Sequence, residues 1–453
     1  MARGKKKEPL TPEDRLQASL VPESEQPYPV PGNWCWVYWG VCGDFQAGSA
    51  FKNEYQGLTE YKIPFYKVGS LKYSDSNGIL YDTSNTVNEE VRIKLKAALI
   101  PKNSIIFAKI GEAIRLNRRS INPVPCCIDN NLMSFYAKVC LTKYVYFWSL
   151  GIDFYNYTNA TTVPAIRKSD LEKVAFPLAP SAEQQRIVDR IESLFAKLDE
   201  AKQKAQDALD SFETRKAAIL HKAFNGELTA QWRKEHGVGM ESWEKVSLVD
   251  VCILRSGTTI PVEHELSKGI IPYVKVADMN LPENYLTITT SSRFVNSCVD
   301  SHIIPYGSTI FPKRGGAILT NKKRFIAVPG IIADLNIMAI IPNIELINNW
   351  YCYYWMLSID LRELNNGSNV PQINNKDMVK LNIPKPSLLE QSEIVRILED
   401  LLSKEQQAKE ATEGMVEQID LIKKSILARA FRGELGTNDP NEESAVELLK
   451  QVL

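Results

Sequence analysis

The stretch from Ser181 to Phe224, "SAEQQRIVDRIESLFAKLDEAKQKAQDALDSFETRKAAILHKAF", places apolar residues at alternating spacings of four and three. The positions that share this seam are Ile187, Ile191, Leu194, Leu198, Ala201, Ala205, Ala208, Phe212 and Ile219, and only Arg215 interrupts it. A 3.5-residue period over about five heptads predicts a coiled-coil helix rather than a surface amphipathic helix. At 1.5 Å per residue, about 40 residues span roughly 60 Å. We therefore expect a spacer.

A second segment with the same period begins at Ser387. Its seam consists of Ile394, Leu398, Leu401, Ala408, Met415, Ile419, Ile422 and Ile426, with Glu405 and Thr412 as exceptions. Helix-start chemistry precedes both seams, because Ser181 with Gln184 and Ser387 with Glu390 fit the capping box. Each long helix needs a partner, and about 150 residues lie between the two. The sequence therefore predicts that the helices pair with each other as an antiparallel coiled coil.

The two helices belong to an internal repeat that covers nearly the whole chain. "KAAILHKAFNGEL" from Lys216 matches "KKSILARAFRGEL" from Lys423 at 8 of 13 positions, and "IPKNSIIFAKIGEAIRLNRR" from Ile100 matches "IPYGSTIFPKRGGAILTNKK" from Ile304 at 10 of 20. Chance gives about one identity in twenty. The tryptophans Trp36 and Trp243 are taken as equivalent. The shared AFxGEL motif is interpreted as a helix exit, with Gly226 as a left-handed terminator.

Each repeat opens with Ile-, Val- and Phe-rich runs broken by Gly and Pro, which predict short strands and turns. The aromatic stretches "KYVYFWSL" (143–150) and "WYCYYWML" (350–357) follow, and each predicts a helix packed on a sheet. The expected fold is mixed α/β (α+β), with two similar β-rich globular domains separated by the long helices in a pseudo-two-fold repeat. The expected segments are a flexible arm at 1–30, a first domain at 31–180, a helix and its exit at 181–235, a second domain at 236–386, a second helix at 387–435, and a tail at 436–453.

Composition excludes several classes of protein. The 453 residues carry a formal net charge of zero, so nucleic-acid binding has to come from local basic patches. No apolar run reaches 18 residues without a charge or a proline, and the N-terminus lacks an apolar signal core, which favours a soluble, cytoplasmic protein. The eight cysteines include no CxxC pair and fit buried free thiols.

A search for catalytic chemistry finds none. No P-loop or glycine-rich dinucleotide or methyl-donor loop is present, and no two of the four histidines have metal-ligand spacing. Asp129 and Asp334 occur at matching places, each followed two residues later by Asn, and a turn beside a buried strand is the favoured interpretation. We therefore expect no catalytic residues, no metal and no cofactor.

Basic residues gather at one place in each repeat, around a predicted hairpin whose tip carries an asparagine. These candidate DNA-binding residues are Lys109, Arg115, Asn117, Arg118 and Arg119 in the first repeat, and Lys313, Arg314, Asn321, Lys322, Lys323 and Arg324 in the second. Lys and Arg neutralise phosphates and pair with guanine edges, and Asn pairs with adenine. A solvated hairpin on an ordinary surface is the alternative. The recurrence of the basic hairpin at equivalent places in the two repeats favours DNA binding.

The chain resembles the specificity subunits of type I restriction–modification systems over essentially its full length. The most specific stretches are "PLAPSAEQQRIVDRIESLF" (177–195), "RKAAILHKAFNGELTAQWR" (215–233), "IPKPSLLEQSEIVRILEDLL" (383–402) and "KKSILARAFRGEL" (423–435). The resemblance implies two target recognition domains that each read one half of a split, asymmetric DNA sequence. It also implies docking of two methyltransferase subunits, which use S-adenosylmethionine, and of ATP-dependent restriction subunits.

Three other interpretations stay open on the sequence. The chain could be the recognition module of a modification-only methyltransferase. It could instead be a coiled-coil adaptor that joins two proteins through its globular heads. A cryptic nuclease would show metal-dependent cleavage by the lone chain.

Overall fold

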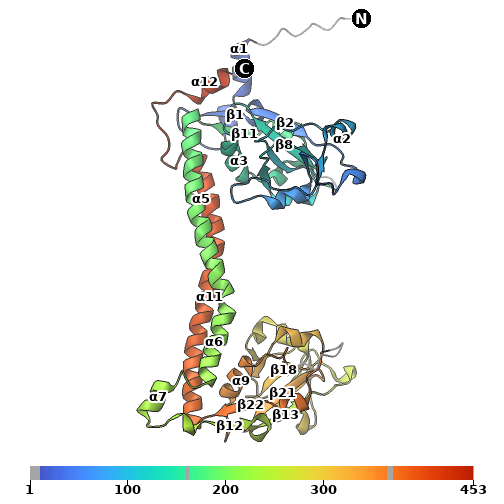
Figure 1. The fold of residues 1–453 in the computed structure, drawn as a ribbon, viewed down its shortest axis with the longest axis vertical. Coiled ribbons are helices and arrows are strands. Elements are labelled where there is room, and N and C mark those ends of the chain that lie inside the picture. Colours follow the sequence, from blue (N-terminus) through green and yellow to red (C-terminus); the bar gives the residue numbers. More distant parts are fainter. Residues whose placement is uncertain (1–10, 160–162, 365–370, 452–453) are drawn as a thin grey trace. The chain divides into compact units, whose positions relative to one another are not determined.

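The computed structural model describes residues 11–159, 163–364 and 371–451. The chain divides into two compact units: unit 1 comprises 1–205 and 415–453, and unit 2 comprises 206–414. Each unit therefore contains one globular domain together with parts of both long helices (Figure 1). The helices are α5 (Ser181–Asp210), α6 (Phe212–Phe224) and α11 (Leu388–Ala430). The first predicted helix is thus divided in two at Ser211, whose hydroxyl donates to the Ala208 carbonyl.

The domain of unit 1 is built on two small sheets. Strands β2 (Gly43–Ala47), β8 (Leu132–Ala137), β5 (Ile105–Ala108) and β6 (Arg119–Ile121) form an antiparallel sheet in that order. The second sheet has the order β4 (Thr86–Val87), β3 (Ile63–Tyr66), β7 (Cys127–Ile128), and β3 and β7 run parallel. Two strand pairs complete the domain: β1 (Cys35–Tyr38) pairs with β11 (Ala175–Leu178), and β9 (Thr158–Asn159) pairs with β10 (Ala165–Ile166). The helices of the domain are α1 (Pro12–Ser19), α2 (Glu89–Lys94), α3 (Thr142–Leu150) and α4 (Lys168–Leu171).

The domain of unit 2 repeats this topology. Its antiparallel part has the order β13 (Cys252–Ser256), β21 (Ile337–Pro342), β18 (Thr309–Pro312), β19 (Arg324–Ile326), with β15 (Thr287–Ile288) added parallel at the edge. The second sheet has the order β16 (Phe294–Val295), β14 (Ile271–Val274), β20 (Gly330–Ala333), β17 (Ile304–Pro305), and β14 and β20 run parallel. Strands β12 (Glu244–Ser247) and β22 (Asn382–Lys385) pair, and the helices are α7 (Ala230–Glu235), α8 (Leu248–Val251), α9 (Asn349–Ser358) and α10 (Asn375–Met378).

The predicted aromatic helices are confirmed as α3 and α9, and both are largely buried in the cores of their domains. Each receives the phenylalanine of an AFxGEL motif from within its own unit. The Phe431 ring lies edge-on to Tyr144 with centroids 5.1 Å apart, and Phe224 lies edge-on to Tyr351 at 5.3 Å. The motif thus fastens a helix end to the aromatic helix of a domain. The positive φ of 85° at Gly226 also confirms the predicted left-handed exit.

Within each unit the long helices pair antiparallel. In unit 1, Asp199 pairs with Lys423 and Lys202 pairs with Asp420 at 2.7 Å, so numbers rise on one helix as they fall on the other. In unit 2, Arg215 reaches Glu405 at 2.9 Å, which places the one interruption of the first seam opposite an exception in the second.

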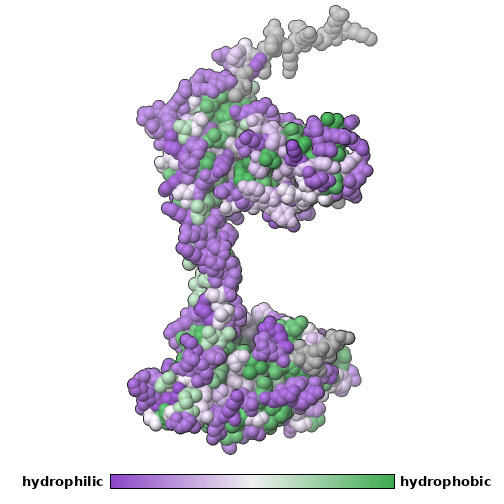
Figure 2. Space-filling view, in the orientation of Figure 1, coloured by the Kyte–Doolittle hydropathy of each residue, from purple (hydrophilic) through white to green (hydrophobic). Residues whose placement is uncertain are grey.

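The predicted seam of α11 is wrong at some positions. Met415 and Ile422 are 52% and 45% exposed, whereas Ile419 and Leu427 are buried. An α-helix has 3.6 residues per turn, so a buried face does not have to follow a 3.5-residue repeat along its whole length. Figure 2 shows the long helices as a mostly hydrophilic surface interrupted by apolar positions.

The predicted capping boxes are only partly present: the Ser387 hydroxyl accepts from the Glu390 N–H at 3.3 Å, but the side chains of Gln184 and Glu390 bind elsewhere. Glu183, Gln184, Glu390 and Gln391 are all buried and bind groups outside the first helical turn. In unit 1, Glu183 accepts from the Trp34 indole and the Asn438 amide, both at 2.7 Å. The Gln184 side chain accepts from the Leu141 backbone N–H that precedes α3 and donates to the Ala179 carbonyl.

Unit 2 has the same construction with different donors. Glu390 accepts from the Trp243 indole at 3.0 Å and from Arg233 at 2.6 Å, and Gln391 accepts from the Asn348 N–H that precedes α9. Trp34 therefore occupies the place of Trp243, and the assignment of Trp36 to that place is wrong. Trp36 instead donates to the Tyr28 carbonyl at 3.1 Å.

The termini differ from the expected arm and tail. Residues 12–19 form α1, which contacts α12 (Ala445–Lys450), and Figure 1 shows both at one end of unit 1. The Ala445 N–H donates to the Asn33 carbonyl, and Arg186 forms a two-pronged ion pair with Glu442. Described residues from both ends of the chain thus help to close the domain of unit 1.

The Arg233–Glu390 ion pair provides a stability test, because both side chains are buried. Arg233→Met leaves a buried carboxylate without its cation, and we expect the free energy of unfolding to fall by about 3–5 kcal/mol in urea titrations. Arg186→Met, which breaks the more exposed pair with Glu442, serves as the control and is expected to cost about 1 kcal/mol or less. Equal losses in the two variants contradict the prediction. The double variant Arg233→Met with Glu390→Gln should recover part of the loss.

Candidate nucleic-acid interface

The predicted basic hairpins exist in both domains. Strands β5 and β6 are joined through the 3₁₀ turn η5 (Glu112–Leu116), and β18 and β19 through η12 (Gly316–Thr320). Each turn ends at an asparagine in the left-handed conformation, with φ of 51° at Asn117 and 53° at Asn321. Asparagine tolerates this region better than most residues, which accounts for an Asn at each tip.

The two asparagine side chains point into their domains. Asn117 donates to the Ile152 carbonyl at 3.1 Å and accepts from the Phe154 N–H at 3.2 Å. The Asn321 oxygen accepts from the Leu361 N–H at 2.9 Å. These amides fasten the hairpin to the loop after α3 or α9. The prediction that they read adenine is therefore not supported by their geometry.

A buried cation lies beside each asparagine. Arg119 is 4% exposed, donates to the Ile152 carbonyl at 2.7 Å, and stacks on Phe154 with its guanidinium carbon 3.7 Å from the ring centroid. Lys323 is 2% exposed and donates to the Ile359 carbonyl at 2.5 Å and to Asn321 at 2.6 Å. Both cations belong to the interior of the hairpin, which corrects the expected surface position.

Burial shifts the titration of both groups. Removal from water lowers the pKa of Arg119 to about 9 and that of Lys323 to about 7. The Arg119 guanidinium is still charged at neutral pH, whereas the Lys323 amine is close to half neutral. The same position thus carries a cation at neutral pH in one domain and an amine that titrates near neutral pH in the other.

The remaining predicted residues differ in exposure. Arg115, Arg118 and Arg314 are exposed, and Lys109, Lys322 and Arg324 are half-buried. Lys313 is buried and donates to the Ser256 hydroxyl at 2.7 Å. Arg115 is held by Glu112 at 2.7 Å, and Arg324 donates to the carbonyls of Met279, Lys323 and Asn284. The outward candidates are therefore Arg118 and Arg314, with Lys109 and Lys322 at the margin.

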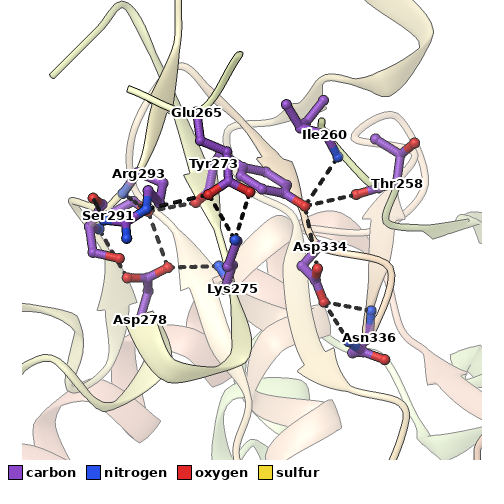
Figure 3. Close-up of polar contacts among 11 residues, drawn as sticks. Thr258, Ile260, Glu265, Tyr273, Lys275, Asp278, Ser291, Arg293, Asp334 and Asn336 are labelled. Carbon is purple, nitrogen blue, oxygen red and sulfur yellow. Dashed lines mark hydrogen bonds and ion pairs between the residues drawn. The ribbon is translucent and has the colours of Figure 1, made fainter. Parts of the chain in front are cut away.

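A second polar cluster lies at the carboxyl ends of β14 and β20 in unit 2 (Figure 3). Lys275 donates to Glu265 at 2.7 Å, and Arg293 lies 3.3 Å from the same carboxylate. The buried Asp278 accepts from the Lys275 N–H at 2.7 Å and from the Ser291 hydroxyl. Because these acids satisfy the neighbouring cations, the cluster stabilises the loops around the strand ends.

Asp334 belongs to the same region and forms a turn. Its carboxylate accepts from the Asn336 N–H at 2.9 Å and lies 3.3 Å from the Tyr273 hydroxyl (Figure 3). In unit 1, Asp129 accepts from the Asn131 N–H at 2.9 Å, and burial raises the pKa of Asp129. The favoured interpretation of both aspartates as turn residues is confirmed.

Lysine also recurs at the carboxyl end of the matching strand. Lys67 follows β3 and donates to Gln56 at 2.7 Å, and Lys275 follows β14 and donates to Glu265. The two strands share Ile, Pro and Lys at matching places, Ile63, Pro64 and Lys67 in the first and Ile271, Pro272 and Lys275 in the second. The acceptors of these lysines could not be identified, because Gln56 and Glu265 come from loops that differ between the repeats.

Sequence reasoning missed the cations on the helix side of each hairpin. In unit 2, the turn around Asn321 faces residues of α6 across a cleft of about 920 Å³, and Lys216 and His221 line its helix wall. In unit 1, Asn117 and Arg115 face the end of α11 across a cleft of about 490 Å³, which Lys424 of α11 and Arg432, two residues past the helix, line. The sequence signal that could have identified these cleft residues was the presence of cations outside the apolar seam, near each AFxGEL motif.

Within 11–159, 163–364 and 371–451, no helix combines the length and the apolar character needed to cross a membrane. The same ranges contain no group of three or more His, Cys, Asp or Glu side chains arranged to hold a metal ion.

Two copies of one domain, each with a cation-bearing hairpin beside a long helix, define a duplicated recognition protein. The chain belongs to the family described as type I restriction modification DNA specificity domain, whose model matches residues 42–209 and 240–413.

Known proteins of this family resemble the chain over most of its length. The type I restriction enzyme EcoDI specificity subunit of Escherichia coli is 24% identical over 326 residues, covering 64% of this chain and 71% of that protein. The MjaVIII specificity subunit of Methanocaldococcus jannaschii is 23% identical over 387 residues, covering 78% and 83%.

Solved structures share the fold. The crystal structure of the HsdS subunit from Thermoanaerobacter tengcongensis has a TM-score of 0.61 at 19% identity, covering 91% of this chain and all of that one. A chain from work on complex assembly and conformational transition of the type I R-M system has a TM-score of 0.69 at 17% identity, covering 90% and 100%.

Lys323 provides a pH test. Its pKa is about 7 when folded and 10.5 as the ordinary value, so the unfolded chain binds more protons between these limits and stability rises with pH there. We expect the unfolding free energy of the wild type, measured relative to that of Lys323→Met, to rise from pH 7 to 10, by up to about 1.4 kcal/mol per pH unit. Urea titrations at several pH values measure it, with Lys322→Met as the control from the same turn. A constant difference contradicts the buried, titrating lysine.

Proposed function

We propose that the chain is the specificity subunit of a type I restriction–modification system and that each domain reads one half of a split, asymmetric DNA target. The observation that carries this proposal is the duplicated hairpin, with basic residues at equivalent places in two domains of the same topology. Two domains that differ in their loops suit two different half-sites. The exposed Arg118 and Arg314 are the proposed outward contacts, and phosphate or guanine groups are their ordinary partners.

The catalytic chemistry belongs to partner subunits in this proposal. Two methyltransferase subunits modify the DNA with S-adenosylmethionine, ATP-dependent restriction subunits join them, and the chain works in the cytoplasm without catalysis of its own. The names of the relatives, all type I specificity subunits, support this assignment. The exposed Met415 and Ile422 on α11 support docking on the long helices, because exposed apolar positions on a polar helix suit a protein interface.

The long helices set the unspecified gap between the half-sites. Helix α11 alone has 43 residues, which correspond to roughly 65 Å at 1.5 Å per residue. A helical spacer of defined length restricts the separations at which two domains can both meet a duplex. The target adenine becomes available to a methyltransferase pocket when it leaves the base stack.

The binding proposal is tested with the full chain and its methyltransferase partner. Methylome sequencing of a host that carries the system supplies the target, and gel shifts then compare that duplex with a random one. We expect a preference of roughly 10³-fold or more at physiological salt. Equal affinity for both duplexes overturns the proposal and favours an adaptor that joins proteins.

The spacer is tested by inserting one heptad, in register, into both long helices. Seven residues add about 10 Å, so we expect the gap to lengthen by about three base pairs while the half-sites stay the same. Methylome sequencing reads the new target directly. Insertion into one helix alone is the control and should impair the complex, because it misaligns the pair. An unchanged gap in the double insertion refutes the spacer.

A further inference from the structure

The two clefts beside the hairpins are equivalent parts of the duplicated fold. In unit 2, the walls are the turn ending at Asn321, the loop with Ile359 and Asp360, and the exposed side of α6. In unit 1, they are Asn117, the loop with Ile152 and Asp153, and the end of α11. The hairpin turn, the loop after the aromatic helix and a long-helix end recur in both clefts, whereas Tyr285 and Leu286 line only the cleft of unit 2 and Tyr28 only that of unit 1. A cleft that recurs in both domains is expected to bind a ligand that contacts both domains.

Cations outnumber acids in the cleft of unit 2. Its Lys and Arg residues are Lys216, Lys322, Lys323, Arg324 and Arg362, against the acids Glu213 and Asp360. Asp360 is held by Arg362, with nitrogen to oxygen distances from 2.5 to 3.0 Å. Lys323 donates to the Ile359 carbonyl and to the Asn321 side chain, and Arg324 donates to backbone carbonyls. Lys216 from the helix and Lys322 from the turn therefore supply the positive charge to an incoming group.

The cleft of unit 1 has the same sign of charge. Arg115 from the turn, Lys424 from α11 and Arg432 from the segment just after α11 line it, and Asp153 is its acid. The Arg432 guanidinium lies over the Tyr28 ring, with its carbon 5.3 Å from the centroid. Arg432 is the variable residue of AFRGEL, and its counterpart in AFNGEL, Asn225, lines the cleft of unit 2.

We propose that both clefts hold phosphates of the DNA backbone, so that the exit end of each long helix takes part in DNA binding. The ligand class is the phosphodiester group, and the contacts come from Lys216 and Lys322 in unit 2 and from Lys424 and Arg432 in unit 1. The helices thereby gain a role beyond spacing. Duplex DNA is favoured over a free nucleotide because the same cleft recurs in both domains. This inference rests on the proposed function.

The test replaces the helix-wall lysines, Lys216→Gln and Lys424→Gln, in the full chain bound to its methyltransferase partner. Fluorescence anisotropy measures affinity for the target and for a random duplex from low to high salt. Each lost phosphate contact should lower the slope of log affinity against log salt by about 0.9, which corresponds to roughly eightfold at 0.1 M salt relative to 1 M. Both duplexes should be affected alike, because phosphate contacts carry no sequence information.

Matched controls come from lysines on the same long helices outside the clefts. Lys204→Gln and Lys404→Gln each remove an exposed lysine that pairs with an acid one turn away, and both should retain the wild-type slope. Equal loss in these controls overturns the inference, because it assigns the effect to general charge. Thermal unfolding of all four variants confirms that the fold is retained.

The outcomes separate the two proposals. A wild-type complex that prefers a split target, with Lys216→Gln and Lys424→Gln unchanged in affinity and slope, overturns the cleft inference alone. A wild-type complex without any preference overturns the proposed function. Calorimetry with deoxyadenosine monophosphate is the second arm: nucleotide binding that Lys216→Gln abolishes, with duplex affinity unchanged, assigns the cleft to a free nucleotide and also overturns the inference.

Discussion

The structure depends on a buried Glu–Gln pair at the start of each long helix. Glu183 and Glu390 each accept from a tryptophan indole, and Gln184 and Gln391 each bind the backbone N–H that precedes an aromatic helix. A buried carboxylate is tolerated only where donors satisfy it, so these contacts fix the helix against its domain in one register. The first turns of each long helix are therefore held in one position on the domain of their own unit.

The two units meet the same requirement with different donors. In unit 2 the connector after α6 supplies Arg233, a cation, whereas in unit 1 the tail after α11 supplies the neutral amide of Asn438. The AFxGEL motif brings each of these segments into place by fastening Phe224 or Phe431 to an aromatic helix. In each unit, the segment that follows an AFxGEL motif thus contacts the buried glutamate at the start of the other long helix.

In each hairpin the exposed and the buried cations are neighbours in the sequence. Sequence located both hairpins and their basic residues, because strand pairs and turns leave a local signal. It could not separate Arg118, which is exposed, from Arg119, which is buried, although the two are neighbours. Arg119 begins β6, whose three residues are all buried, whereas Arg118 lies in the turn before the strand, so the position of the strand boundary decides between solvent and core.

The sequence by itself determined the duplication, the aromatic helices, the long helices and the family, because each of these is a pattern of spacing or identity along the chain. Only the tertiary structure decided the equivalence of Trp34 with Trp243, the seam positions of α11 that are exposed, and the inward direction of Asn117 and Asn321. The clefts belong to the same class, because their walls come from segments far apart in the chain. Such features depend on which donor meets which acceptor across the fold, and no local period in the sequence records that choice.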